Sequence, residues 1–320
     1  MVQWHTKEEA EPESEYGKPP HRRTAEELLE QGFVVIDKPY GPTSNQVSHW
    51  IKEELDCKKT GHFGTLDPNA TGVLPVGINQ GTKIADALSK ARKEYIAEIE
   101  LREEISEEKI LTTLKEFEGT NTQTPPDKSA VKQEPREREL YEAELLEAAE
   151  EKMLVRLECE SGFYVRVLAQ QLGEELDTDA EMTELRRTKQ GDLEISDSHT
   201  IQDVVDAYHF YAEDNDGEEL ENILQPIEQA VNHIKKLVIK DTAVNAVANG
   251  AELGVNGISK LQDGIKEEET VAIMTLKGEL VALAEAQMNA QDIYGAEDGT
   301  AASLEKVFMN PQTYPKNWNQ

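Results

Sequence analysis

Residues 61–83 read GHFGTLDPNATGVLPVGINQGTK, the most informative stretch of this 320-residue chain. A single carboxylate, Asp67, stands among glycines and threonines, directly before Pro68. The apolar run 73–76 that follows predicts a buried strand, and the glycines on either side predict turns. A surface turn in which Asp67 accepts hydrogen bonds from nearby backbone N–H groups would show the same spacing. The pattern therefore predicts a loop leading into a strand, and by itself leaves the role of Asp67 open.

The segments around this loop alternate between strand and helix patterns. Apolar residues at every second position of 95–101 are typical of a half-buried strand, and apolar residues at helical spacing follow the candidate caps Ser44, Thr82 and Ser106. This mixed order predicts an α+β fold around a mainly antiparallel sheet. Strands are expected at 33–37, 73–76, 95–101, 139–146 and 153–159, helices at 44–55, 82–88, 106–117, 165–176, 179–187 and within 200–232, and a loop or mobile hairpin at 120–139.

Beyond about residue 235 the chain changes to short Val- and Ile-rich runs separated by glycines. Several short strands with glycine turns predict a small second domain that resembles a β-barrel. We therefore expect an acidic, extended or partly disordered N-terminal extension (1–31), a main α+β domain (32–234), the β-barrel-like domain (235–311) and a C-terminal tail (312–320) that wraps back on the body.

The composition excludes several classes of protein. The N-terminal residues show no basic segment followed by an apolar one, so no secretory signal is expected, and no run approaches the ~20 apolar residues of a membrane span. Two cysteines, Cys57 and Cys159, cannot form a disulfide framework, and no Cys/His spacing suggests zinc. We expect a cytoplasmic, reduced, metal-free protein without membrane contact.

The chain is strongly acidic, with 64 Asp and Glu against 33 Lys and Arg and a net charge of −31. Such a charge ordinarily argues against nucleic acid as a partner. It also suits a cytoplasm at molar salt, where the Debye length falls to about 3 Å and surface carboxylates repel each other little. Residues 32–93 escape the acidity, with six acidic and eight basic residues. We therefore expect a halophilic protein that meets phosphate groups in this segment.

Several long motifs, taken in order, resemble one known family. The stretch 61–83, GFVVIDKPYGPTS (32–44), KEYIAEIEL (93–101), ESGFYVRVLAQQLGEEL (160–176) and AEMTELRRTKQG (180–191) are similar to motifs of TruB-type RNA pseudouridine synthases, in the archaeal and eukaryotic branch that includes dyskerin, the catalytic subunit of H/ACA guide-RNA particles. NGAELGVNGISKL (249–261) and VAIMTLKGELVALAEA (271–286) resemble a PUA domain. The resemblance covers nearly the whole chain. It makes 32–234 the catalytic domain and 235–311 an RNA-binding PUA domain.

The resemblance implies a reaction and three catalytic residues. The uridine N1–C1′ bond is broken, the uracil turns, and C5 is joined to C1′, with no cofactor or metal. Asp67 matches the family nucleophile, and a carboxylate can add covalently and leave again. Arg166 matches the arginine that pairs with it, and Tyr95 matches the tyrosine that stacks on the target base. As ordinary residues, Arg166 would be a surface charge and Tyr95 a core aromatic.

The resemblance also implies contacts to RNA and to other proteins. The target base must leave its stack, which costs a few kcal/mol, and His62 matches a residue that contacts the flipped nucleotide. Guide RNA, rRNA, tRNA and other H/ACA core proteins are the implied partners, with a role in ribosome biogenesis. The expected RNA-binding residues are His62, Thr65, Lys38, Leu185, Gly250 and Ala251, and Lys58, Lys59, Lys83 and Lys93 are further lysines that could meet phosphates.

Three functions remain open from the sequence. The first is guided pseudouridylation inside an H/ACA particle, which the PUA-like segment and the N-terminal extension favour. The second is stand-alone modification of the T-loop uridine 55 of tRNA. The third is a non-catalytic RNA-binding scaffold, which the presence of Asp67, Tyr95 and Arg166 together argues against.

Overall fold

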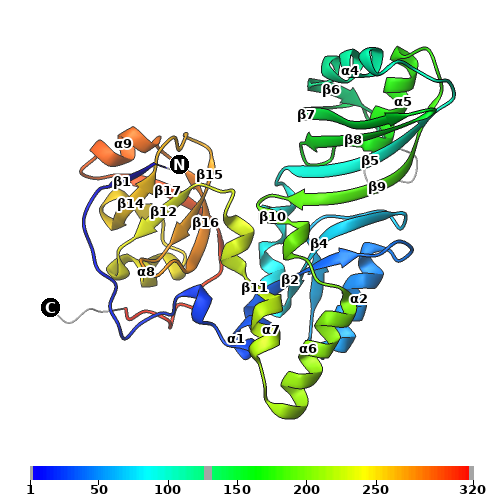
Figure 1. The fold of residues 1–320 in the computed structure, drawn as a ribbon. Coiled ribbons are helices and arrows are strands. Elements are labelled where there is room, and N and C mark those ends of the chain that lie inside the picture. The colour runs from blue at the N-terminus through cyan, green and yellow to red at the C-terminus, as the bar shows by residue number, and fades with distance from the viewer. Residues whose placement is uncertain (1–2, 126–131, 317–320) are drawn as a thin grey trace. The chain divides into compact units, whose positions relative to one another are not determined.

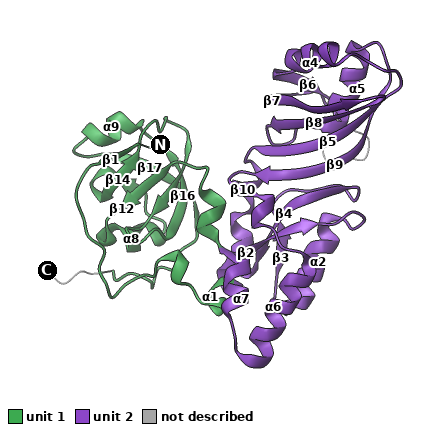
Figure 2. Ribbon diagram, viewed as in Figure 1, with its two compact units in different colours: residues 1–28, 226–320 green, residues 29–225 purple. Residues whose placement is uncertain are grey.

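The computed structural model describes residues 3–125 and 132–316 and divides the chain into two compact units (Figures 1 and 2). Unit 1 joins residues 1–28 to residues 226–320, and unit 2 comprises residues 29–225. No helix in the described part of the chain is long and apolar enough to span a bilayer. The N-terminal segment thus groups with the C-terminal domain, whereas the sequence suggested a separate extension.

Unit 2 is built on one sheet, with the strand order β11-β2-β4-β9-β5-β8-β7-β6 in the described residues, β3 also pairing with β4 and β10 with β9. Only β4 and β9 pair in parallel among the registers determined for this sheet, so the expected mainly antiparallel α+β fold is confirmed. The strands are β2 (Gly32–Lys38), β3 (Thr60–His62), β4 (Ala70–Ile78), β5 (Lys93–Leu101), β6 (Gly119–Gln123), β7 (Arg136–Ala149), β8 (Lys152–Cys159), β9 (Ala180–Gln190), β10 (Leu193–Glu194) and β11 (Leu224–Pro226).

Helices pack on this sheet through apolar faces. In α2 (Ser44–Glu54) and α5 (Val165–Glu175) the buried residues recur at three- and four-residue spacing, as an amphipathic helix requires. The remaining helices are α1 (Ala25–Gln31), which runs across the sequence boundary of the units, η2 (Asn79–Ile84), α3 (Ala85–Ser89), α4 (Glu107–Glu116), η3 (Ile195–Asp197), α6 (Ile201–Asp214) and α7 (Glu218–Ile223).

Two local predictions differ from the structure, and a third is confirmed in part. The helix expected at 179–187 was wrong, because this segment forms β9, the strand that joins β4 to β5. Of the loop or mobile hairpin expected at 120–139, the hairpin is confirmed in part, since Gly119–Gln123 pairs antiparallel with Arg136–Leu140, while residues 126–131 lie outside the described residues. The caps also differ: Thr43 rather than Ser44 caps α2, and the Thr82 hydroxyl donates to the carbonyl of Asn79 instead of capping a helix.

Unit 1 contains the strand order β1-β14-β12-β15-β16-β17-β13 around a common apolar core (Figure 1). Its short, glycine-separated strands confirm the expected β-barrel-like domain. The strands are β1 (Trp4–Thr6), β12 (Lys236–Ile239), β13 (Leu253–Gly254), β14 (Ile258–Gln262), β15 (Thr270–Met274), β16 (Leu280–Ala286) and β17 (Thr300–Val307), and the helices are η1 (Pro20–Arg22), η4 (Ile227–Val231), α8 (Asp241–Ala248), η5 (Val255–Gly257) and α9 (Ala290–Gly295).

Both ends of the chain contribute to unit 1. Trp4–Thr6 pairs with β14, and the Arg23 guanidinium donates to both carboxylate oxygens of the buried Glu228, at 2.7 and 2.8 Å. Tyr314 is 1% exposed, and its hydroxyl donates to Glu279 Oε2 at 2.7 Å. The tail therefore wraps back on the body as expected up to this residue. The N-terminal segment is fixed in place because it completes a sheet edge and neutralises a buried carboxylate.

Candidate active site

Asp67 lies in a tightly held turn between β3 and β4. The backbone N–H of Ala70 donates to the Asp67 carbonyl at 3.0 Å, and the N–H of Gly41 donates to the Pro68 carbonyl at 2.8 Å. Just before it, Leu66 is buried, and the hydroxyl of Ser44, the first residue of α2, both accepts from the Leu66 N–H and donates to its carbonyl. Backbone contacts on both sides thus fix the turn, and the Asp67 side chain is left 58% exposed.

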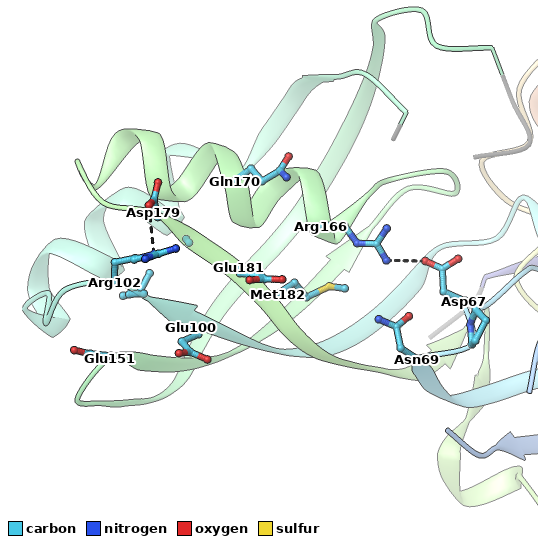
Figure 3. Close-up of a pocket in the computed structure, with 13 residues that line it drawn as sticks. Asp67, Asn69, Glu100, Arg102, Glu151, Arg166, Gln170, Asp179, Glu181 and Met182 are labelled. Atoms are coloured by element: carbon cyan, nitrogen blue, oxygen red, sulfur yellow. Dashed lines mark hydrogen bonds and ion pairs between the residues drawn. The ribbon is translucent and has the colours of Figure 1, made fainter. Parts of the chain in front are cut away.

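The Asp67 carboxylate pairs with Arg166, the second residue of α5. Arg166 Nη2 donates to Asp67 Oδ2 at 2.9 Å, and Figure 3 shows the two side chains pointing toward each other. Val165, Leu168, Ala169 and Leu172 bury the opposite side of α5, which fixes the direction of Arg166. The pair that the family resemblance implied is therefore present in the geometry of the chain.

This ion pair sits at one end of an open cleft of about 1070 Å³. The other wall is acidic, and Arg102 on that wall pairs with Asp179 across 3.4 Å (Figure 3). Such a cleft is as large as a typical site for a small molecule, and large enough for a nucleotide turned out of its stack. The lining residues are Asp67, Pro68, Asn69, Glu100, Leu101, Arg102, Glu151, Arg166, Gln170, Asp179, Ala180, Glu181 and Met182.

Tyr95 is not one of the residues that line this cleft. Its side chain is 8% exposed on β5, opposite Arg187 of β9. Burial raises the pKa of the phenol, and the positive charge of the nearby Arg187 guanidinium opposes that rise. Tyr95 is therefore a buried, neutral phenol beside a buried cation.

Arg187 is a fully buried cation that the sequence did not identify as a site residue. Its Nε donates to the Val73 carbonyl at 2.7 Å, and its Nη2 donates to the Gly64 carbonyl at 3.1 Å. Gly72 of β4 packs against the backbone of Arg187 itself. A Cβ atom at position 72 would lie 2.1 Å from the Arg187 carbonyl oxygen. One residue thus ties β9 to β4 and to the loop that carries Asp67. The adjacent pair of arginines was the only signal in the sequence.

Lys38 supports the same loop from below. It is fully buried, and its ammonium donates to the carbonyls of Pro39, Pro68 and Ala70 at 3.0, 3.3 and 2.7 Å. Burial lowers the pKa of Lys38, while the nearby Asp67 carboxylate opposes that effect. The sequence predicted contact between Lys38 and RNA, but in this structure all three donors of its ammonium serve the backbone around Asp67.

The other residues expected to bind RNA lie at different depths. His62 is half-buried on β3, with Nε2 3.1 Å from Asn45 Oδ1, and burial lowers the pKa of its imidazole. Thr65 is exposed in the loop before Asp67. Leu185 is half-buried on β9 and pairs with Ala70, three residues after Asp67, so it adjoins the site.

Gly250 and Ala251 belong to unit 1, where they follow the end of α8. Both are exposed, and Gly250 adopts a φ of +94° with no heavy atom within 4 Å of the position of a Cβ. Backbone hydrogen bonds to Val247 and Ala246 hold the two residues in this turn. The backbone is therefore open to close approach by another molecule, and RNA contact here stays a prediction.

Family models match nearly all of residues 1–308. Residues 52–165 match the TruB family pseudouridylate synthase N-terminal domain and residues 166–232 match the tRNA pseudouridylate synthase B C-terminal domain. Residues 235–308 match the PUA domain and residues 1–48 match the DKCLD domain. The matches follow the order of the motifs in the sequence.

Comparisons with whole proteins and solved structures point to the same family. The chain is 46% identical to the probable tRNA pseudouridine synthase B of Methanocaldococcus jannaschii, over 98% of this chain and 94% of the relative. It is similar to a chain in the crystal structure of a Cbf5–Nop10–Gar1 complex, with a TM-score of 0.95, 44% identity and coverage of 99% and 97%. It also resembles a chain in the structure of an H/ACA ribonucleoprotein bound to a substrate RNA containing 2′-deoxyuridine, with a TM-score of 0.93, 42% identity and coverage of 99% and 98%.

Proposed function

This chain belongs to the TruB family of pseudouridine synthases, in the dyskerin-like branch with a C-terminal PUA domain, and from that premise we propose which of its residues isomerise uridine in RNA. Asp67 is the nucleophile, Arg166 is its charge partner, and Tyr95 lies against the target base once the base has entered the cleft. In the reaction the N1–C1′ bond breaks and a C5–C1′ bond forms. N1 gains a proton and C5 loses one, so that substrate and product contain the same atoms.

The observation that carries this assignment is the Asp67–Arg166 contact of 2.9 Å at the end of the cleft. A guanidinium beside a carboxylate favours the ionised form and fixes its direction, which is the state that a nucleophile needs. The side chains of Ser44 and Lys38 and the backbone N–H of Gly41 donate to carbonyls of the turn. Because the turn is already fixed, Asp67 loses little conformational entropy when RNA binds. Carboxylates can form and release a covalent intermediate.

Tyr95 acts from beneath the cleft in this scheme. The target base leaves its stack at a cost of a few kcal/mol, and an aromatic ring recovers part of that cost by stacking. Because Tyr95 is now almost fully buried, the RNA must displace part of the cover over its ring. Arg187 holds the phenol in place meanwhile and acts as a positioning residue.

RNA recognition is assigned to both units. His62, Thr65 and Leu185 contact the nucleotides around the target, and Gly250 and Ala251 in the PUA domain (235–311) approach RNA through their backbone. Lys38 supports the Asp67 loop in our account and does not contact phosphate.

The setting of the reaction follows from the relatives. The similar Cbf5 chain is found in a complex with Nop10 and Gar1, and another similar chain is found in an H/ACA ribonucleoprotein with substrate RNA. We therefore place this chain in an H/ACA particle in the cytoplasm, where guide RNA directs it to rRNA during ribosome biogenesis. Curated relatives are named as tRNA pseudouridine synthases, which supports activity on the T-loop uridine of tRNA as the second candidate.

The acidity of the chain fits a cytoplasm at molar salt. With a net charge of −31, the carboxylates of the folded chain repel each other less strongly when the Debye length is short. RNA recognition then depends on shape, stacking, base pairing with the guide and partner proteins, because salt weakens phosphate contacts.

Mass-spectrometric mapping of pseudouridine tests this function. Purified protein is incubated with unmodified rRNA fragments and tRNA, alone and with guide RNA and the partner proteins. Modification of rRNA only when the guide and partners are present supports the guided role, and modification of bare tRNA supports the second candidate. The absence of pseudouridine under every condition would leave the scaffold role as the better description.

A further inference from the structure

The lysines of residues 32–93 fall into two groups in the structure. Lys38 and Lys93 are buried, and their ammonium groups donate to backbone carbonyls. Lys58, Lys59 and Lys83 are exposed and line one hollow of about 210 Å³ in unit 2. We call this the lysine hollow, and its lining residues are Glu30, Lys58, Lys59, Asn79, Gln80, Thr82 and Lys83.

Asn79 builds the floor of the lysine hollow. Its Oδ1 accepts from the backbone N–H groups of Lys58 and Lys59, at 3.0 and 3.3 Å, and its own N–H donates to the Lys59 carbonyl at 2.8 Å. Its Nδ2 donates to the Leu29 carbonyl at 3.0 Å, and its φ of +45° lies in the left-handed region. Three chain segments are thus joined at one residue, so the two neighbouring lysines begin from a fixed backbone.

The lysine hollow brings three exposed cations together in an acidic chain. Within the described residues none of Lys58, Lys59 and Lys83 takes part in an ion pair, although acidic residues outnumber basic ones by 64 to 33. Exposed Lys115 and Lys152, by contrast, each pair with a glutamate. Grouped lysines repel each other, and an anion in the hollow relieves that repulsion.

The lining points to phosphate rather than to an apolar ligand. All seven lining residues are polar, and only Glu30 is acidic. The amide and hydroxyl of Gln80 and Thr82 add hydrogen-bonding groups between the amines. Ammonium groups bind phosphate oxygens as compact point charges.

We propose that the lysine hollow binds backbone phosphates of RNA at a distance from the target uridine, an inference that rests on the proposed function. Asn79 directly follows the last residue of β4, and Asp67 precedes the first residue of that strand by three positions. A nine-residue strand spans roughly 25–30 Å, so the hollow and the nucleophile lie at opposite ends of it. The hollow therefore adds affinity for an extended RNA and leaves the chemical step unchanged.

The test compares the full-length protein with four variants on a fluorescently labelled tRNA transcript. Replacing Lys58, Lys59 and Lys83 by Gln should weaken binding roughly tenfold or more at the lowest salt at which the protein is folded, and should lower the slope of log K against log [KCl] by about 2, from roughly 0.7–0.9 per contact. The rate constant for pseudouridine formation at saturating RNA should stay within twofold of the parent. Replacing the same lysines by Arg keeps the charge and should keep the affinity.

Lys90, Lys115 and Lys152 provide the matched control, because they are exposed lysines of the same unit that line neither the hollow nor the cleft. Replacing these three by Gln removes the same charge and should change the slope by less than half as much. Glu30→Gln should strengthen binding.

Equal affinities and equal salt slopes for the two triple Lys→Gln variants would overturn the inference. An acidic protein surface would then be the better candidate for the hollow. If the parent protein forms no pseudouridine on any RNA, the proposed function itself fails. The measurements of RNA affinity and of its salt dependence test the hollow independently of whether pseudouridine is formed.

Discussion

At the scale of single residues, the proposed chemistry depends on one ion pair between partly exposed side chains. Asp67 is 58% exposed and Arg166 is 38% exposed, so water competes with their 2.9 Å contact until RNA covers the cleft. We expect Arg166→Ala to lower the rate constant at saturating RNA by roughly 100-fold or more, comparable to the loss of one preorganised donor in other enzymes. Single-turnover kinetics measures this constant.

Arg102 is the control for that variant. It lies in the same cleft and pairs with Asp179 at 3.4 Å, with both side chains about four-fifths exposed. Arg102→Ala should leave the rate constant within a few-fold of the parent, because it does not touch Asp67. A similar loss in both variants would mean that general charge in the cleft, and not the pair with Asp67, controls the rate.

Lys93 makes the stability of the protein depend on pH. Burial, together with the nearby Arg187 guanidinium, lowers the pKa of Lys93 to about 7, below the ~10.4 of an exposed lysine. Between these two values the unfolded chain holds the proton that the folded chain has lost, so stability rises with pH. Relative to Lys93→Met, the parent should gain about 2 kcal/mol from pH 7 to pH 9 in denaturant titrations at molar KCl.

Lys90→Met is the matched variant for this measurement, because Lys90 is exposed and three positions away. It should follow the pH profile of the parent. If Lys93→Met also follows the pH profile of the parent, the Lys93 amine of the parent does not titrate in this range in the folded protein.

Single residues also show what sequence could reveal about the site. Asp67 and Arg166 were predicted because their types and neighbours match a family motif, and the structure shows the implied contact between them. The supporting roles of Lys38 and Arg187 were not found, because a lysine or arginine in sequence looks like a surface charge. Only three-dimensional packing shows that both are fully buried and bonded to carbonyls.

At the scale of elements, the clearest failure of sequence reasoning is β9. AEMTELRRTKQ is rich in residues that favour helix, such as Glu, Leu, Met and Arg. Pairing with β4 on one side and β5 on the other overrides that preference, and no local pattern encodes those distant partners. The strands with alternating burial, such as β5, were predicted because their period is visible locally.

The N-terminal segment offers a test at this scale. The Arg23–Glu228 pair joins residues 205 positions apart in sequence, and both side chains are largely buried, at 14% and 8% exposed. Arg23→Met leaves Glu228 without its partner and should destabilise unit 1 by about 3 kcal/mol. Thermal unfolding monitored at a probe in unit 1 measures the loss.

Lys18→Met is the comparison, since the Lys18–Glu27 pair lies in the same segment and is 40% and 45% exposed. Its loss should cost less than about 1 kcal/mol. Equal and small effects of the two variants would mean that residues 1–28 do not contribute to the stability of unit 1.

At the scale of the whole molecule, charge is the dominant feature. Sixty-four carboxylates on one chain repel over the ~10 Å Debye length of dilute buffer, and the range falls to about 3 Å at molar salt. We expect the unfolding midpoint to rise steadily between about 0.1 and 3 M KCl. A midpoint that is flat or falls over this range would rule out the proposed adaptation to high salt.

The central claim is that Asp67 performs the isomerisation, and Asp67→Asn tests it most directly. The measurement is tritium release from RNA labelled at C5 of uridine, made under single-turnover conditions with parent and variant at equal occupancy of RNA. Asn keeps the size of the side chain and removes its nucleophilic oxygen, so the variant should bind RNA with the affinity of the parent and release no tritium above background. Release by Asp67→Asn at a measurable fraction of the parental rate would contradict the account.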